Sequence, residues 1–254
     1  LQEVDRFDEL SHGLAEHGYS GLHLPKAVGR DGLALFHRRD LLVPLGFERP
    51  ADARLRYRGR DGSPATQVAL LARFQFHDRT LLVATTHLRA KEGHELEREA
   101  QARELCEHID RIRRPGEAII VAGDFNDTPT SVALESMKRS SLALKSAYTA
   151  LHSGEDAWTT WKIRERETRR VIDYVFHSPE LAPVRLLQAP DTAHVPAHRL
   201  PDWAFPSDHL DLAVELGLSV EARHGHQAEL GAARGPRGQD SPLPSSDLDC
   251  TLEK

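Results

Sequence analysis

The sequence predicts an α/β fold in which two packed mixed β-sheets are flanked by helices. Its 254 residues suffice for one sizeable domain with a buried core. Segments with strand character form hairpins and mix irregularly with helical segments, so the regular strand–helix alternation of a Rossmann fold or an (α/β)8 barrel is missing. The sequence also lacks both common glycine-rich phosphate loops, which argues against nucleotide triphosphate chemistry by that route.

Hydrophobic periodicity places the individual elements. Phe7, Leu10 and Leu14 share one face of the first predicted helix. Apolar residues recur at helical spacing among many charges in a later segment, which Pro115-Gly116 ends. The predicted elements are, in order, helix 7–18, strand 32–40, hairpin strands 66–76 and 80–88, helix 94–113, strand 118–126, helix 130–139, strand 169–178 and strand 209–216.

The amino-acid composition of the chain changes near Gly217. From there Gly, Pro and Ser are abundant and apolar periodicity is weak, so we expect a catalytic domain over residues 1–216 and a disordered tail over 217–254. His224 and His226 lie in this tail, but two histidines alone make an incomplete metal site.

Composition limits the classes of function. The formal net charge is -6, so bulk attraction for nucleic acid is not expected, and a phosphate-bearing substrate must meet a local cluster of cations or a metal. The two cysteines supply neither a disulfide framework nor a thiolate zinc site, which suits a reducing compartment. No apolar run approaches the ~20 residues that a membrane-spanning helix needs.

Polar side chains recur at the ends of strands that should be buried. They are Glu3, His87, the pair Asp124 and Asn126, Asp173, and the pair Asp208 and His209. Any one of them alone is readily explained as a satisfied polar group or a turn. Because unpaired buried carboxylates are costly, their repetition indicates mutual pairing or a bound cation.

The residue types favour one chemistry. Carboxylate and amide oxygens suit a hard ion such as Mg²⁺, which typically keeps water and takes substrate phosphate into its shell. An Asp–His pair suits a general base, and a His and an Asn on phosphate oxygens would stabilise growing negative charge. The expected reaction is metal-assisted attack of water on a phosphate ester.

Six short motifs, taken in the order of the chain, resemble those of a known superfamily. "LQEVD", "DGLALF", "TTHL", "GDFNDTP", "IDYVF" and "SDHL" resemble the motifs of the endonuclease/exonuclease/phosphatase superfamily over about residues 1–216. This resemblance implies the deoxyribonuclease-I-like four-layer α/β sandwich. "SLALKSAY", "TTWKIR" and "RLPDWAFPSDHL" are most similar to a branch related to the carbon-catabolite-repressor-type deadenylases. That branch implies removal of the 2′-phosphate from NADP⁺ and NADPH, or poly(A) deadenylation.

The resemblance also implies roles for individual residues. Glu3 would be the main Mg²⁺ ligand, with Mn²⁺ as an alternative ion, and Asp208 would help hold the metal. His209, oriented by Asp173, would act as base or phosphate partner. Asp124 would orient the water or the leaving oxygen. Asn126 and His87 would contact the phosphate that is cleaved.

Four cations are expected to bind the remaining phosphates: Lys26, Arg89, Lys91 and Arg169. The alternative is that they are ordinary solvated surface charges. Lys91 stands where the branch has Arg. An ammonium, which acts as a point charge, therefore replaces a guanidinium that could bind phosphate through two parallel hydrogen bonds. Asp127 is expected to be structural, as a cap of the following helix.

The chain opens at Leu1, inside what resembles the end of a strand. We therefore expect the superfamily's first strand, with its metal-side Asn, and any targeting peptide to be missing from this sequence. The expected protein is a monomer in the cytoplasm, or in mitochondria if a transit peptide precedes it.

Three functions remain open at this point. The first is a phosphatase for the small dinucleotide NADP(H), which the acidic balance favours over a long RNA. The second is a 3′-to-5′ exoribonuclease on poly(A). The third is an inactive binding fragment.

Overall fold

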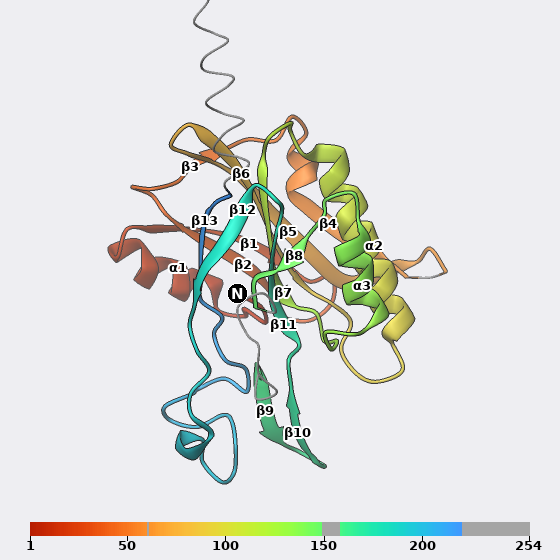
Figure 1. The fold of residues 1–254 in the computed structure, drawn as a ribbon, viewed down its shortest axis with the longest axis vertical. Helices are drawn as coiled ribbons and strands as arrows, with labels where there is room; N and C mark the ends of the chain where they lie inside the picture. Colours follow the sequence, from red (N-terminus) through yellow and green to blue (C-terminus); the bar gives the residue numbers. More distant parts are fainter. Residues whose placement is uncertain (60, 149–157, 220–254) are drawn as a thin grey trace, which may run out of the picture. The chain divides into compact units, whose positions relative to one another are not determined.

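A seven-stranded mixed sheet organises the chain (Figure 1). The computed structural model describes residues 1–59, 61–148 and 158–219, and Leu1–Ser219 form one compact unit. The strand order is β3-β5-β6-β7-β11-β8, and β4 also pairs with β5. The strands are β3 (Val43–Leu45), β4 (Arg54–Arg58), β5 (Pro64–Phe76), β6 (Arg79–His87), β7 (Ala118–Asp124), β8 (Lys145–Ser146) and β11 (Asp173–His177).

Two helices cover one face of this sheet. They are α2 (Glu95–Ile112), which connects β6 to the parallel strand β7, and α3 (Val132–Arg139). The apolar face of α2 buries Ala102, Leu105 and Ile109 in the main core, together with side chains of β5, β6 and β7. The crossover helix therefore occupies the face that a parallel strand connection needs.

The opposite face is covered by a hairpin and a further helix. The hairpin consists of β1 (Tyr19–Pro25) and β2 (Gly32–Arg38), and α1 (Phe7–Glu16) packs on its outer side. Leu33 and Leu35 lie in one apolar cluster with Leu70 and Phe74 of β5, while Phe7 stacks on the ring of His23 at 4.8 Å. This succession of α1, hairpin, central sheet and α2/α3 confirms the predicted four-layer α/β sandwich.

The remaining strands form small antiparallel pairs rather than a second large mixed sheet. β9 (Thr160–Ile163) pairs with β10 (Glu167–Arg170), and β12 (Leu181–Leu186) pairs with β13 (Val214–Leu218). Two short 3-10 helices, η1 (Pro50–Ala53) and η2 (Thr192–His194), complete the described elements. None of the described helices is long and apolar enough to cross a membrane.

Several predicted boundaries need correction. The predicted strand 169–178 divides into the end of β10 and all of β11, because its residues pair with two different partners. The predicted strand 209–216 begins only at Val214 and continues to Leu218. The predicted division of the chain near residue 216 stays a prediction. Residues 220–254, which include His224 and His226, lie outside the described residues.

The glycine of "AGDFN" is required by the spacing of the central strands. Gly123 pairs with Thr86 across the parallel β6–β7 ladder. A Cβ at position 123 would overlap the carbonyl oxygen of Thr86. Gly123 thus lets β6 and β7 approach closely just before His87 and Asp124.

Replacing Gly123 with Ala should push these strands apart and destabilise the protein by about 1–3 kcal/mol, which is typical of an overpacked site. Chemical denaturation of the full chain measures this change. Gly13→Ala is the matched control, because nothing lies within 4 Å of its added Cβ and alanine in a helix interior should stabilise by roughly 0.5–1 kcal/mol. Equal stability of the two variants would contradict the close-approach argument.

Candidate active site

Strand register brings three of the predicted residues into one row. His87 ends β6, Asp124 ends β7 and Asp173 begins the antiparallel strand β11. In the ladders His87 is opposite Asp124, and Asp124 is opposite Asp173. The row therefore lies at one edge of the central sheet, with all three side chains buried.

His209 joins this row from the segment before β13. Its Nδ1 lies 2.9 Å from Oδ2 and 3.1 Å from Oδ1 of Asp173. The Thr159 hydroxyl donates to Oδ2 of Asp173 at 2.6 Å and holds that carboxylate in place. Burial alone would lower the pKa of His209, but the hydrogen bond to Asp173 and the charges of Asp173 and Asp124 outweigh it and raise that pKa.

Asp124 lies between two imidazoles. Its Oδ2 is 3.5 Å from Nε2 of His87 and 4.0 Å from Nε2 of His209. Burial, followed by the charge of Asp173, raises the pKa of Asp124 to about 7. Burial and the nearby Lys26 ammonium lower the pKa of His87 to about 4. Near neutral pH, His87 is therefore uncharged, while Asp124 is close to the midpoint of its titration.

Asn126 is held in an unusual backbone conformation beside this row. Its φ is 50°, its N–H donates to Oδ1 of Asp124 at 2.7 Å, and its Nδ2 donates to the Leu88 carbonyl at 3.1 Å. Lys91 and Glu3 also have positive φ, at 80° and 55°. Such strain persists only where the surrounding structure enforces it, and it concentrates at functional sites.

The buried guanidinium of Arg98 holds the loop after β6 and the loop after β7 in position. Nε of Arg98 donates to Asp127 at 2.9 Å, and its Nη1 donates to the carbonyls of Arg89 and Lys91 at 3.1 and 2.8 Å. Asp127 is therefore structural, but the predicted helix cap is wrong. Ser131 caps α3 by accepting from the N–H of Leu134.

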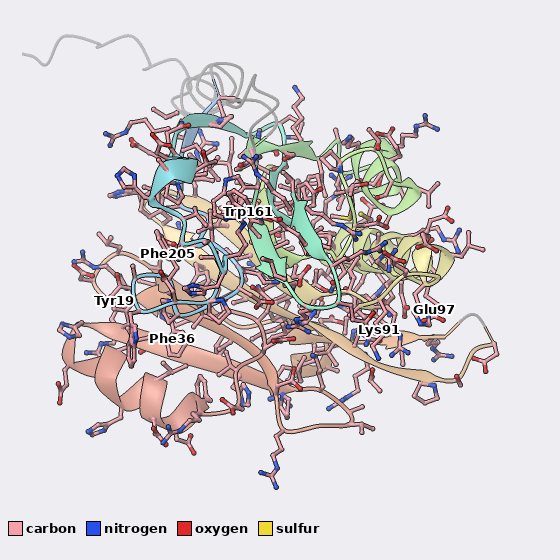
Figure 2. All side chains as sticks on the ribbon, turned by 90° about the horizontal axis from the view of Figure 1, so that it is seen from below. Tyr19, Phe36, Lys91, Glu97, Trp161 and Phe205 are labelled. Carbon is pink, nitrogen blue, oxygen red and sulfur yellow. The ribbon has the colours of Figure 1, made fainter. Side chains whose placement is uncertain are left out.

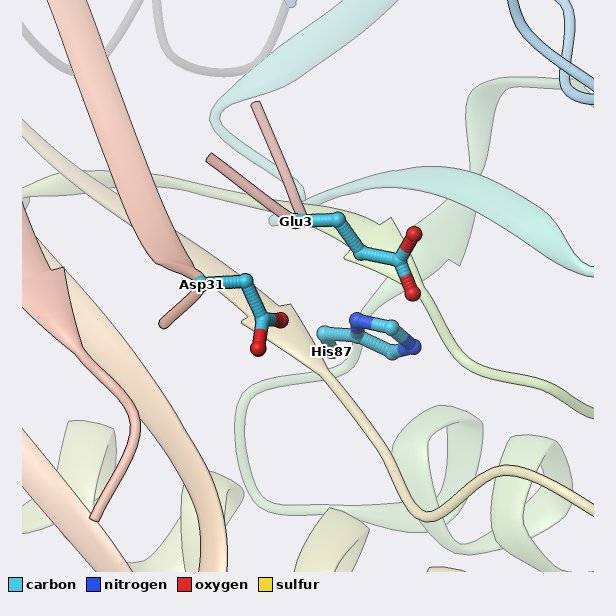
Figure 3. A group of neighbouring side chains, drawn as sticks. All are labelled: Glu3, Asp31 and His87. Carbon is cyan, nitrogen blue, oxygen red and sulfur yellow. The ribbon is translucent and has the colours of Figure 1, made fainter. Parts of the chain in front are cut away.

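Glu3 lies in a group suited to a cation. Ligand atoms of Glu3, Asp31 and His87 are all within 4.8 Å of one another (Figure 3). Gln2 anchors the segment by donating to Thr85 Oγ1 at 2.9 Å. Asp31 was not predicted, although it belongs to the quoted "DGLALF". Asp124, Asp173 and His209 form a second such group.

Asp208 does not join Glu3 in these groups. Its Oδ2 accepts from Nζ of Lys162 at 2.5 Å and from Nη2 of Arg164 at 3.3 Å. Partial burial opposes ionisation, but the hydrogen bond and charge of Lys162 prevail and lower the pKa of Asp208. Asp31 lies beside Glu3, whereas Asp208 pairs with cations, and the metal-binding role of Asp208 stays a prediction.

A pocket of about 910 Å³ adjoins Asn126. One side is the loop after β6, and the other is the β9–β10 hairpin, which Figure 2 locates through the labelled residues Lys91 and Trp161. Five cationic side chains line it: Lys91, Lys162, Arg164, Arg166 and Arg170. Glu92 and Glu165 also line the pocket, which therefore has an excess of cationic side chains on a chain of net charge -6.

The four predicted phosphate-binding cations differ in their placement. Lys91 lines the pocket. Lys26 forms an ion pair with Asp31, and its Nζ lies 3.5 Å from Nδ1 of His87. The side chain of Arg89 turns toward Glu97, with Nε 3.6 Å from Oε2.

Arg169 lies over the ring of Trp161 at 4.8 Å and does not line the pocket. Side chains alternate along β10, so the neighbouring Arg170 faces the pocket instead. The same alternation in "TTWKIR" places Thr160 and Lys162 on the pocket face. The alternation of side chains along β9 and β10 is the sequence signal that identifies these pocket residues, but it can be used only when the strand boundaries are known.

Known proteins resemble this chain in sequence and in fold. The profile of the Endonuclease/Exonuclease/phosphatase family matches residues 1–209. Nocturnin of Homo sapiens is 33% identical over 241 residues, which cover 87% of this chain and 54% of the human protein. Nocturnin of Xenopus laevis is also 33% identical, and the match covers 60% of its length. The chain thus spans a little over half the length of these relatives.

Solved structures show the same fold. The human Nocturnin catalytic domain with bound sulfate anion has a TM-score of 0.73 and 29% identity, covering 86% of this chain and 80% of that domain. ANGEL2, a 2′,3′-cyclic phosphatase, has a TM-score of 0.72 at 18% identity and supports the fold alone. These similarities confirm the resemblance inferred from the motifs.

Replacing Asp173 with Asn should lower the pKa of His209. The substitution removes the hydrogen bond and negative charge that hold that pKa above its ordinary value. NMR titration of the metal-free protein measures it from the imidazole C–H shifts, assigned with a His209→Asn variant. An unchanged titration of His209 would show that Asp173 does not control its protonation.

Proposed function

The chain belongs to the endonuclease/exonuclease/phosphatase family, and from that premise we propose that it hydrolyses the 2′-phosphate of NADP⁺ and NADPH with Mg²⁺. The observation that carries this proposal is that Asn126, whose N–H donates to Asp124 of the catalytic row, also lines the cationic pocket. A row of proton-exchanging groups suits phosphate ester hydrolysis. The pocket suits the further phosphates of a dinucleotide.

The residues around Glu3 fit a divalent cation. Glu3 and Asp31 supply hard oxygen donors, and the lowered pKa of His87 keeps its imidazole neutral near pH 7. Mg²⁺ bound by these carboxylates would neutralise phosphate charge and favour attack by water. Lys26, paired with Asp31, limits the negative charge of the group when no ion is bound.

The Asp124–His209 pair moves the protons of the proposed reaction. Asp124, with a pKa of about 7, can accept a proton from the attacking water. His209, held by Asp173 and favoured as an imidazolium, can donate to the leaving oxygen or balance phosphate charge. Asn126, which donates one amide hydrogen to the Leu88 carbonyl, would bind a phosphate oxygen with its other amide hydrogen.

The size of the pocket supports a small substrate. An extended single strand calls for a long positive groove, whereas the cations here are gathered in one pocket of about 910 Å³. A 3′-to-5′ exoribonuclease on poly(A) is the alternative, because its substrate presents the same adenosine and phosphate chemistry.

Purified full chain with Mg²⁺ should release inorganic phosphate from NADPH, and chelation by EDTA should abolish the release. His209→Ala and Asp124→Ala should each lower kcat at least ~100-fold, the usual contribution of a positioned proton donor or acceptor. His12→Ala, an exposed histidine of α1, is the control and should match the wild type.

Other outcomes discriminate among the three functions. Shortening of oligo(A) without phosphate release from NADPH would establish the exoribonuclease instead. Binding of NADPH without turnover of either substrate would identify a binding protein. Near-normal turnover by His209→Ala would contradict the assigned proton pair.

A further inference from the structure

Glu92 connects the two sides of the cationic pocket. It follows Lys91 in the loop after β6, and its Oε1 accepts from Nη2 of Arg166 and, at 3.3 Å, from Nη2 of Arg170. Arg166 lies in the turn of the β9–β10 hairpin, between Ile163 and Glu167. These contacts span 74 and 78 residues of sequence, so they join separate parts of the fold.

The bridge lies at the end of the β9–β10 hairpin that is distant from the catalytic row. Thr160, at the base of the hairpin, forms an isolated β-bridge with His209. Arg166 lies at the opposite end of the same hairpin, where Glu92 reaches it. A substrate that extended from His209 along the hairpin would meet the Glu92 bridge before it left the pocket.

The bridge also determines which cations of the pocket are available to bind phosphate. Asp208 pairs with Lys162 and Arg164, and Glu92 pairs with Arg166 and Arg170. Lys91 is the pocket cation whose ammonium has no carboxylate partner among the described residues. A polyanion thus finds four of the five pocket cations already in contact with a carboxylate.

Stability does not explain this arrangement. The side chains of Glu92 and Arg166 are 69% and 66% exposed, and ion pairs between exposed groups contribute little to folding. Loss of the bridge should therefore change what the pocket binds while leaving the fold intact.

We propose that Glu92 is a specificity-determining residue, whose bridge to Arg166 and Arg170 excludes polynucleotide strands and restricts the pocket to small nucleotides. This inference deepens the proposed function. Binding measurements test it separately, because they require no turnover.

The test compares Glu92→Gln with Glu165→Gln in the full chain. Both substitutions remove one negative charge from residues that line the same pocket, but Glu165 has no ion-pair partner among the described residues. Fluorescence anisotropy with labelled oligo(A), in EDTA and at several salt concentrations, measures strand binding. The intrinsic fluorescence of NADPH measures binding of the small nucleotide under the same conditions.

Glu92→Gln should tighten oligo(A) binding about five- to tenfold at low salt and steepen its salt dependence, since two arginines become available to phosphates. The slope of log K against log salt should become more negative by about 1.4, at ~0.7 per contact for a single strand. NADPH affinity should change less than oligo(A) affinity. Glu165→Gln should leave the salt slope close to that of the wild type.

Two results would overturn the proposal. Equal effects of Glu92→Gln and Glu165→Gln would show that net charge alone matters. Unchanged oligo(A) binding by Glu92→Gln would show that the bridge excludes nothing. Because both results come from binding, failure of NADPH hydrolysis would count against the proposed function and not against the role of Glu92.

Discussion

The site depends on the register between β7 and its two neighbours. β7 pairs in parallel with β6 and antiparallel with β11, so His87, Asp124 and Asp173 come from three strands into one row. A shift of one residue in either ladder would turn a side chain to the other face of the sheet. Gly123 protects this register, because any larger residue would collide with the backbone of β6 beside the row.

Burial of the row gives its groups their acid–base character. Burial and, after it, the charge of Asp173 make Asp124 costly to ionise and raise its pKa to about 7. Asp173 in turn stabilises the charged form of His209, and Lys26 with burial keeps His87 neutral. Neighbouring groups of the same type thus acquire different roles because their surroundings differ.

Charge is organised locally rather than across the whole chain. A chain of net charge -6 presents a pocket with five cationic side chains, and Asp208 and Glu92 pair with four of them. These pairs connect the hairpin to the loop after β6 and to the segment before β13. Under the proposed function, substrate phosphates would compete with these carboxylates, which lowers the affinity for polyanions in general and allows selectivity.

The sequence by itself determined the layered α/β class, the helices with strong periodicity, the strand ends that carry His87, Asp124 and Asp173, and the motifs that contain Asn126 and His209. These follow from apolar patterns and from polar residues at motif positions, both of which are local. The tertiary structure alone decided that Asp31 and not Asp208 lies with Glu3, and that Arg170 and not Arg169 faces the pocket. Ion-pair partners far apart in the chain and the alternation within a short hairpin set those outcomes, and neither is visible until the strands have paired.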